Sequence, residues 1–163
     1  MKIALYPGTF DPITFGHIDI AVRASGIFHK VIAIVAENPG KKPLFSLDER
    51  LEMVKESFRG IPGVEVASYS GLMVNCLNEF GATVLIRGLR ALSDFDYEFQ
   101  MAFTNRSLRS TAETVFLMPS SKYIYLNSTI VKQIAKFGGD ISSFVPEHVK
   151  QRLQKKFSSE THV

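Results

Sequence analysis

The sequence predicts an α/β protein built on one doubly wound, five-stranded parallel sheet, with helices on both faces and a further helix at the C-terminal end. Short apolar runs alternate along the chain with amphipathic stretches of helical period, which is the pattern of β-α-β units. The runs are apolar almost throughout, as expected for parallel strands that are buried on both faces. Because no linker, repeat or low-complexity segment interrupts this alternation, we expect residues 1–163 to form a single domain.

The expected elements follow one another regularly. Strands are expected at residues 2–6, 30–36, 64–69, 82–86 and 114–118, and helices at 17–28, 47–58, 72–80, 94–108, 130–137 and from 146 onward. Ser46 and Glu49 form a capping box that opens the second helix. Ser93 and Asp96 are expected to cap the fourth helix, and Gly138 is expected to end the fifth.

Composition narrows the class of protein. Apolar residues make up 45% of the chain, which excludes an intrinsically disordered protein. The net charge of +3 is too small to indicate a nucleic-acid partner, and no apolar run is long enough for a membrane span. The lone cysteine, Cys76, lies in an apolar pattern, so we expect a buried thiol rather than a disulfide or a zinc ligand. With no signal-peptide pattern at the start, we expect a cytoplasmic protein.

Polar and cationic side chains follow most of the predicted strands at the point where each strand ends. In doubly wound sheets the ligand lies outside the carboxyl ends of the strands. The residues expected at that edge are Thr9, Phe10 and His17, then Lys41 and Lys42, then 70–73, then Arg87 and Arg90, and finally 120–129. Some of them precede helices, whose first N–H groups attract anions. The sequence therefore predicts a site for a ligand rich in phosphate groups.

Residues 6–17 form the centre of this predicted site. His17 stands at the start of a helix, where the helix dipole disfavours a charged imidazole. A neutral imidazole can donate one N–H to a phosphate oxygen while a neighbour holds its other nitrogen. Gly8 allows the backbone to approach a ligand closely, and Thr9 adds a hydroxyl group. The alternatives are a surface histidine and an ordinary strand-to-helix turn that Thr9 stabilises.

Arg87 and Arg90 stand at the end of an apolar strand. A buried guanidinium is costly unless it meets an anion, and two of them can hold phosphates bidentately. Ion pairs with Asp94, Asp96 or Glu98 are the alternative.

Further candidates lie on two loops. A lysine of the pair Lys41 and Lys42 could bring positive charge to a transferring phosphate, and the sequence does not decide which of the two points inward. The alternative is a solvated surface pair, which is the interpretation favoured for Lys42. Ser128 and Thr129 precede a helix and suit either phosphate binding or simple N-capping. Because the sequence contains no Walker motif and no cluster of metal ligands, any Mg²⁺ is expected to be held mainly by ligand phosphates and water.

These motifs together resemble one known family. Gly8-Thr9-Phe10-Asp11-Pro12, followed by Thr14-x-Gly16-His17, is similar to the T/H-x-G-H signature of the nucleotidyltransferase superfamily. Segments 41–43, 85–90, 96–98, 116–119 and 128–129 are similar to those of bacterial phosphopantetheine adenylyltransferases. The resemblance covers about residues 2–153 and implies a Rossmann-like nucleotidyltransferase fold.

The resemblance also implies an activity and a set of site residues. In this family, ATP and 4′-phosphopantetheine react with Mg²⁺ present, by direct in-line attack, to give dephospho-coenzyme A and pyrophosphate in a homohexamer. The implied catalytic residues are His17, Lys41 and Thr9, and the implied substrate-binding residues are Thr9, Lys41, Met73 and Arg87. The implied ATP-binding residues are Thr9, Phe10, His17, Gly88, Leu89, Arg90, Glu98, Tyr123, Ile124, Tyr125, Leu126, Asn127, Ser128 and Thr129.

Two other functions remain open at this point. The first is another nucleotidyltransferase of the same superfamily, although nicotinamide-mononucleotide enzymes usually have histidine where Thr14 stands and cytidylyltransferases carry a segment that is missing here. The second is a non-catalytic module that binds a nucleotide or a flavin. The lysine and arginine clusters argue against that module, because a flavin monophosphate needs less positive charge.

Overall fold

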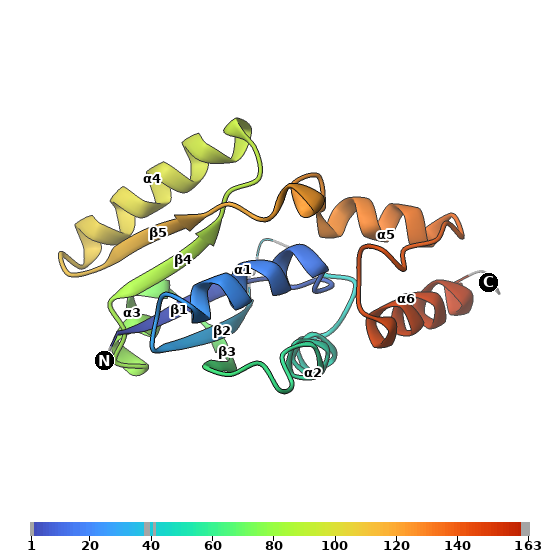
Figure 1. Cartoon of the computed structure of the whole chain (residues 1–163), viewed down its shortest axis with the longest axis horizontal. Coiled ribbons are helices and arrows are strands. Elements are labelled where there is room, and N and C mark those ends of the chain that lie inside the picture. Colours follow the sequence, from blue (N-terminus) through green and yellow to red (C-terminus); the bar gives the residue numbers. More distant parts are fainter. Residues whose placement is uncertain (1, 38–39, 41, 161–163) are drawn as a thin grey trace.

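The computed structural model describes residues 2–160 apart from 38, 39 and 41. Strands and helices alternate as the sequence predicts (Figure 1). The elements are β1 (Ile3–Gly8), α1 (Phe15–Ser25), β2 (Lys30–Glu37), α2 (Leu47–Ser57), β3 (Val64–Ser70), α3 (Met73–Glu79), β4 (Val84–Gly88), α4 (Leu92–Leu108), β5 (Glu113–Leu117), the 3₁₀ turn η1 (Ser121–Tyr123), α5 (Ser128–Lys136) and α6 (Glu147–Glu160).

The five strands form one parallel sheet in the order β3-β2-β1-β4-β5, which confirms the predicted doubly wound topology. β1 lies at the centre, where Leu5 pairs with Ile32 on one side and with Leu85 on the other. The chain therefore leaves β1 in one direction for β2 and β3, and later returns for β4 and β5. The crevice at such a reversal is where doubly wound sheets bind ligands.

Side chains alternate between the two faces of the sheet, and helices cover both. In β1, Ala4 and Tyr6 contribute to the larger core cluster, which is covered by α1 and α2. Leu5 contributes to a smaller cluster on the opposite face, where α3 supplies Cys76 and Leu77. The prediction that Cys76 is buried is confirmed.

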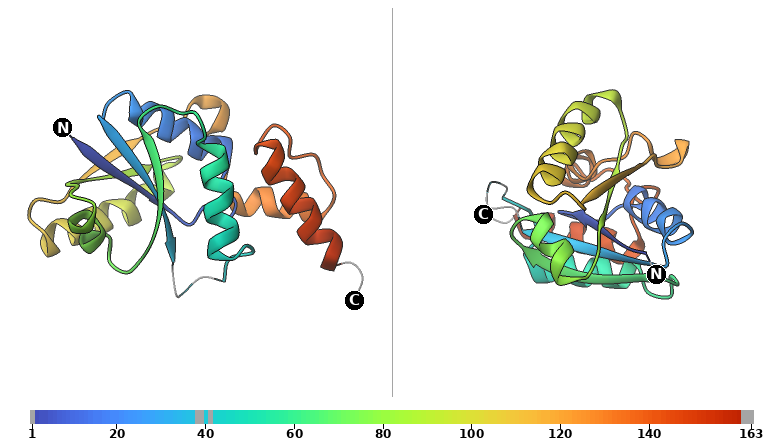
Figure 2. Two further views of the ribbon diagram at one scale, coloured as in Figure 1. Left: turned by 90° about the horizontal axis from the view of Figure 1, so that it is seen from below. Right: turned by 90° about the vertical axis from the view of Figure 1, so that its left-hand side faces the viewer.

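The last two helices lie beyond the carboxyl ends of the strands and lengthen the molecule in that direction (Figures 1 and 2). Val131 of α5 and Val149 and Leu153 of α6 are fully buried in the larger core cluster. α5 is thereby fixed so that its N-terminal end faces the edge of the sheet. Within the described part of the chain, no helix is long and apolar enough to cross a membrane.

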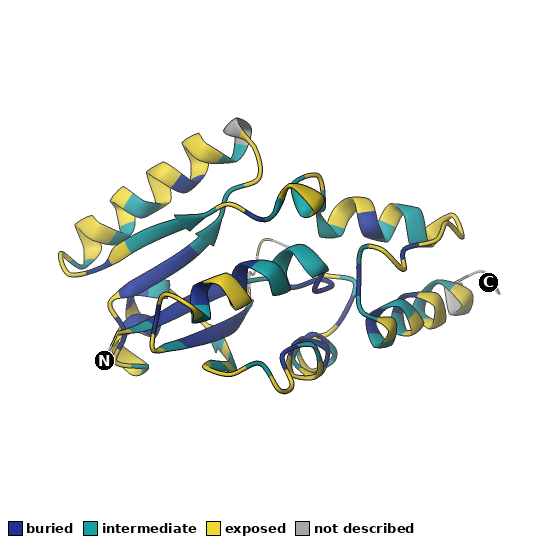
Figure 3. Ribbon diagram, viewed as in Figure 1, coloured by how far each residue is buried: buried dark blue, intermediate teal, exposed yellow. Residues whose placement is uncertain are grey.

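Several helices begin one or two residues away from the predicted start, and at α4 the cap also differs from the prediction. α4 begins at Leu92 and is preceded by Ala91, which makes no side-chain capping bond. The expected capping by Ser93 and Asp96 is therefore wrong, because both residues lie inside the helix. The capping box of α2 is confirmed, since Ser46 Oγ accepts the Glu49 N–H and Glu49 accepts the Ser46 N–H. Figure 3 shows exposed residues along most of α4.

Candidate active site

A cleft of about 840 Å³ lies at the carboxyl edge of β1 and β4 and extends to the N-terminal end of α5. It gathers most of the residues that the sequence places in the site, from segments far apart along the chain. The predicted residues that line it are Thr9, Phe10, His17, Arg87, Gly88, Arg90, Glu98, Tyr123, Leu126, Asn127, Ser128 and Thr129.

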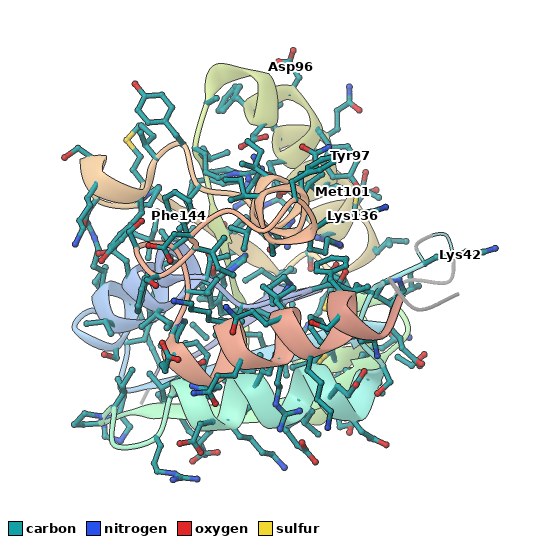
Figure 4. All side chains as sticks on the ribbon, turned by 90° about the vertical axis from the view of Figure 1, so that its right-hand side faces the viewer. Lys42, Asp96, Tyr97, Met101, Lys136 and Phe144 are labelled. Atoms are coloured by element: carbon teal, nitrogen blue, oxygen red, sulfur yellow. The ribbon has the colours of Figure 1, made fainter. Side chains whose placement is uncertain are left out.

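Four predicted residues are not part of the described cleft wall, namely Met73, Leu89, Ile124 and Tyr125. Met73 begins α3 and packs against the smaller core cluster, and Tyr125 is exposed. Their binding roles stay predictions. Lys41 lies outside the described residues. Lys42 is exposed, as expected, and extends away from the body of the molecule in Figure 4, although it also borders the cleft.

His17 is held by the cap of its own helix. Thr14 is the N-cap of α1, and its backbone N–H donates to His17 Nδ1 at 3.1 Å. The Thr14 hydroxyl lies 3.0 Å from the same nitrogen. An amide N–H can only donate, so Nδ1 must be the acceptor and carries no proton. The proton of the neutral ring is then on Nε2, which leaves Nε2–H as the donor available to a ligand.

The surroundings keep this imidazole neutral. Burial of the ring, assisted by the positive charges of Arg90 and Arg87, lowers the pKa of His17 from 6.5 to about 4. The ring of Phe10 packs edge-on against it, with centroids 5.2 Å apart. The prediction that a neighbour holds one nitrogen of a neutral His17 is confirmed. At neutral pH the residue can donate a hydrogen bond but carries no charge.

Arg87 and Arg90 are both in ion pairs. Arg87 donates to both carboxylate oxygens of Glu98, at 2.7 and 2.5 Å, and to the carbonyl of Pro7 at 3.0 Å. Arg90 Nε lies 3.2 Å from Asp94, one helical turn further along the chain. Of the two arrangements that the sequence left open, the structure contains the ion pairs. Both arginines also line the cleft, so their binding of phosphate stays a prediction.

The start of α5 is capped by Asn127, whose side-chain oxygen accepts the N–H of Ile130 at 2.8 Å. Capping by Ser128 or Thr129 is therefore wrong. Ser128 instead donates through its hydroxyl to the carbonyl of Pro12 at 2.7 Å, which ties α5 to the loop after β1. Thr129 lines the cleft within the first turn of the helix. This turn supplies the positive end of a helix dipole to the cleft.

The structure gives contacts to two residues, Asp11 and Lys132, for which the sequence predicted no specific partner. Asp11 is buried and accepts the N–H groups of Leu44 and Phe45 at 2.9 and 3.0 Å. Its carboxylate also receives Lys132 Nζ at 2.6 Å, and Lys132 lines the cleft. Lys132 follows Ser128 and Thr129 by one turn of helix, and that spacing alone could have indicated it.

Arg50 is a further residue of this kind. It is 2% exposed and donates to the carbonyl oxygens of Thr9, Ala36 and Phe45. A search of the inward face of α2 for charged residues could have indicated it, because Arg50 lies on the face that α2 buries.

The described residues contain no group of three or more His, Cys, Asp or Glu side chains that could hold a metal ion. Each carboxylate of the described cleft wall is already paired with a cation, Asp11 with Lys132, Asp94 with Arg90 and Glu98 with Arg87. The donor set of the protein therefore does not by itself fit a resident divalent cation.

The chain is similar to known proteins over most of its length. A model of the cytidylyltransferase-like family matches residues 5–134. A phosphopantetheine adenylyltransferase of Caldanaerobacter subterraneus subsp. tengcongensis is 52% identical over 157 residues, covering 96% of this chain and 98% of the relative. The enzyme of the same name from Methylococcus capsulatus is 54% identical over 155 residues, with 95% and 96% covered.

A solved structure from Vibrio parahaemolyticus, described as a nicotinate-nucleotide adenylyltransferase, shares the fold. Its TM-score is 0.66 at 17% identity, and 94% of this chain and 91% of that chain are covered. At this identity the likeness supports the fold and carries no information about the substrate.

Proposed function

The chain belongs to the cytidylyltransferase-like family and, within it, to the phosphopantetheine adenylyltransferases, and on that premise we propose that it makes dephospho-coenzyme A. In this reaction the adenylyl group of ATP is transferred to 4′-phosphopantetheine and pyrophosphate is released. One observation supports the proposal most strongly. A neutral His17, with its proton on Nε2, lies in the same cleft as the first turn of α5.

The bond changes in this reaction are simple. A phosphate oxygen of 4′-phosphopantetheine forms a bond to the α-phosphorus of ATP. The bond from that phosphorus to the oxygen bridging to the β-phosphate breaks, and its electron pair leaves with pyrophosphate. The attacking phosphate is already an anion, so no strong base is required. Catalysis then depends on alignment of the two phosphates and on stabilisation of negative charge in the transition state.

The described residues are suited to both tasks. His17 Nε2–H can donate to an oxygen of the α-phosphate without adding a positive charge that would be costly to bury. The first turn of α5 and the ammonium of Lys132 provide positive potential for the β- and γ-phosphates. Thr9 and Phe10 line the same cleft. We propose that Lys41 assists the transferring phosphate, although it lies outside the described residues.

We propose that Mg²⁺ enters with ATP and is held mainly by the triphosphate and water. The paired carboxylates of the cleft support this, because none of them is free to act as a ligand without loss of an ion pair. The ion would neutralise charge on the triphosphate. We also propose a cytoplasmic location, where coenzyme A precursors and ATP meet and where the buried thiol of Cys76 stays reduced.

Pyrophosphate release tests the proposed function directly. The chain is incubated with Mg²⁺, ATP and 4′-phosphopantetheine, with nicotinamide mononucleotide replacing the acceptor in one control and CTP replacing ATP in another. We expect pyrophosphate only with the first set of substrates, together with dephospho-coenzyme A in equal amount. Release with nicotinamide mononucleotide but not with 4′-phosphopantetheine would overturn the proposal.

We further propose that the chain forms a homohexamer in which α4 contributes to the contacts. On α4, Phe95 stacks on Phe99 with ring centroids 5.3 Å apart, and the rings of Phe99 and Phe103 pack edge-to-face with centroids 4.7 Å apart. Phe103 is 57% exposed. Tyr97 and Met101, labelled in Figure 4, are exposed on the same helix. A helix with so much apolar surface is typical of a subunit interface.

Analytical ultracentrifugation tests this assembly. We expect wild-type chain to sediment as a hexamer and Phe103→Glu to dissociate it. Val22→Glu is the matched control, because Val22 is an exposed apolar residue on α1. A wild-type chain that sediments as a monomer would overturn the proposal.

A further inference from the structure

We propose that Arg50 is a positioning residue, which holds the peptide between Thr9 and Phe10 so that the N–H of Phe10 is presented to a phosphate of the nucleotide. The inference rests on the proposed function, and it concerns a residue that does not itself line the cleft. Arg50 lies on the inward face of α2 and is 2% exposed.

The hydrogen bonds of Arg50 are unusual for a buried guanidinium. Nη1 donates to the carbonyl of Thr9 at 2.7 Å and to that of Ala36 at 3.1 Å, and Nε donates to the carbonyl of Phe45 at 3.3 Å. No carboxylate of the described residues forms an ion pair with it. Burying a guanidinium whose hydrogen-bond partners are neutral carbonyls costs free energy. We therefore expect its position to serve a purpose beyond stability.

The Thr9 carbonyl determines where the next N–H points. The peptide between Thr9 and Phe10 is trans and planar, so its N–H points in the direction opposite to its carbonyl. The carbonyl is directed at α2 by Arg50, and the N–H of Phe10 is therefore directed away from α2. This N–H has no hydrogen-bond partner within the described part of the chain, and both residues line the cleft. It is available to donate a hydrogen bond to a phosphate oxygen.

The backbone at Phe10 needs such a restraint. Its φ is +49°, a left-handed conformation that residues other than glycine seldom adopt. Such a conformation persists only where the surroundings fix it from more than one side. The Phe10 ring is fixed by packing against Tyr6 and His17, and Arg50 fixes the preceding carbonyl.

The same guanidinium also contacts Ala36 of β2 and Phe45, which precedes α2, through the carbonyl oxygens of both residues. Asp11 accepts the N–H of Phe45, so this residue is held at both its N–H and its carbonyl. Arg50 thus holds Thr9, Ala36 and Phe45 relative to one another, and Thr9 lines the cleft in which the proposed reaction needs two phosphates in line.

Binding of ATP and of adenosine separates positioning from general stability. The variants are Arg50→Met and Arg50→Lys, since Lys keeps the charge but has one nitrogen and cannot reach three carbonyls in the same geometry. Arg109→Lys is the matched control, because Arg109 donates to the Ala82 carbonyl at 3.1 Å, ahead of β4 and away from the cleft.

We expect both Arg50 variants to lower kcat/KM about 10- to 100-fold, the size of effect that follows a misplaced group. We expect the ratio of ATP affinity to adenosine affinity to fall about tenfold, while adenosine affinity stays within twofold of wild type. Arg109→Lys should leave both quantities unchanged. Thermal unfolding shows which variants are folded, and Arg50→Lys decides the matter if Arg50→Met does not fold.

Two results would overturn the inference alone. One is an Arg50→Lys variant with wild-type kcat/KM, which would show that only the charge matters. The other is an equal loss of affinity for ATP and adenosine, which would indicate a merely structural effect. A wild-type chain that binds ATP no better than adenosine and releases no pyrophosphate would instead overturn the proposed function, and the inference with it.

Discussion

Acidification tests how His17 is held. Burial, with Arg90 and Arg87 nearby, lowers the pKa of His17 from 6.5 to about 4 in the folded chain. Between these two pH values the unfolded chain binds a proton at His17 that the folded chain does not bind. The contribution of His17 to the free energy of unfolding is therefore fully present above pH 6.5 and is lost as the pH falls toward 4. At about 1.4 kcal/mol per pH unit, the loss over this interval is roughly 3 kcal/mol.

Urea unfolding measured from pH 7 to pH 4, on wild type and on His17→Gln, isolates this contribution. Gln at the third position of a helix supports a capping box, so the variant keeps an acceptor for the Thr14 N–H. The free energy of unfolding of wild type, relative to that of His17→Gln, should fall by roughly 3 kcal/mol over this range. Carboxylate titration is common to both proteins and cancels.

Nitrogen-detected NMR of the imidazole measures the pKa of His17 and shows which ring nitrogen carries the proton. We expect an unprotonated Nδ1 and a protonated Nε2 at pH 7, with protonation of the ring only near pH 4. The exposed His29 supplies a comparison signal in the same spectra. A His17 pKa at or above 6, or a neutral ring with its proton on Nδ1, would show that the ring is not held in the way described.

Three further predictions follow from close contacts and burial. A Cβ at Gly8 would lie 2.9 Å from the buried ring of Phe10, so Gly8→Ala should cost about 1–3 kcal/mol of stability, measured by urea unfolding, and an unchanged midpoint would contradict this. Burial, with Glu79 nearby, raises the pKa of the Cys76 thiol to about 12. A disulfide reagent at pH 8 should therefore modify the unfolded chain and leave the folded chain unmodified. Rapid modification of the folded chain would show that the thiol is accessible. Glu98→Gln removes the charge that pairs with Arg87 and should cost about 1–3 kcal/mol in the same unfolding assay, with no loss as the contrary result.

The topology could be predicted because its signals are local and repeated. Each buried parallel strand is an apolar run, and each connection contains a helix with an apolar face. The order of the strands then places their carboxyl ends at one edge, and the polar residues after them must meet there. His17 could be assigned a neutral ring for a similar reason, because the helix start lies only a few residues after β1.

Contacts between distant segments could not be predicted in the same way. Arg87 had three carboxylates within reach along the chain, and only the orientation of α4 brings Glu98 rather than Asp96 to it. Arg50 resembles an ordinary helical arginine in the sequence, and its three carbonyl partners come from separate loops. The cap of α5 was misassigned, because Asn127 and the two residues after it are all good capping residues.

The stereochemistry at the α-phosphorus distinguishes direct transfer from transfer through an adenylylated side chain. In the proposed reaction the cleft aligns two phosphates for a single displacement, and no protein side chain is adenylylated. One diastereomer of ATP that carries sulfur on the α-phosphate is converted with 4′-phosphopantetheine, and the configuration of the product is determined by ³¹P NMR. We expect inversion at phosphorus. Retention would show two displacements through an adenylylated residue and would rule out direct transfer.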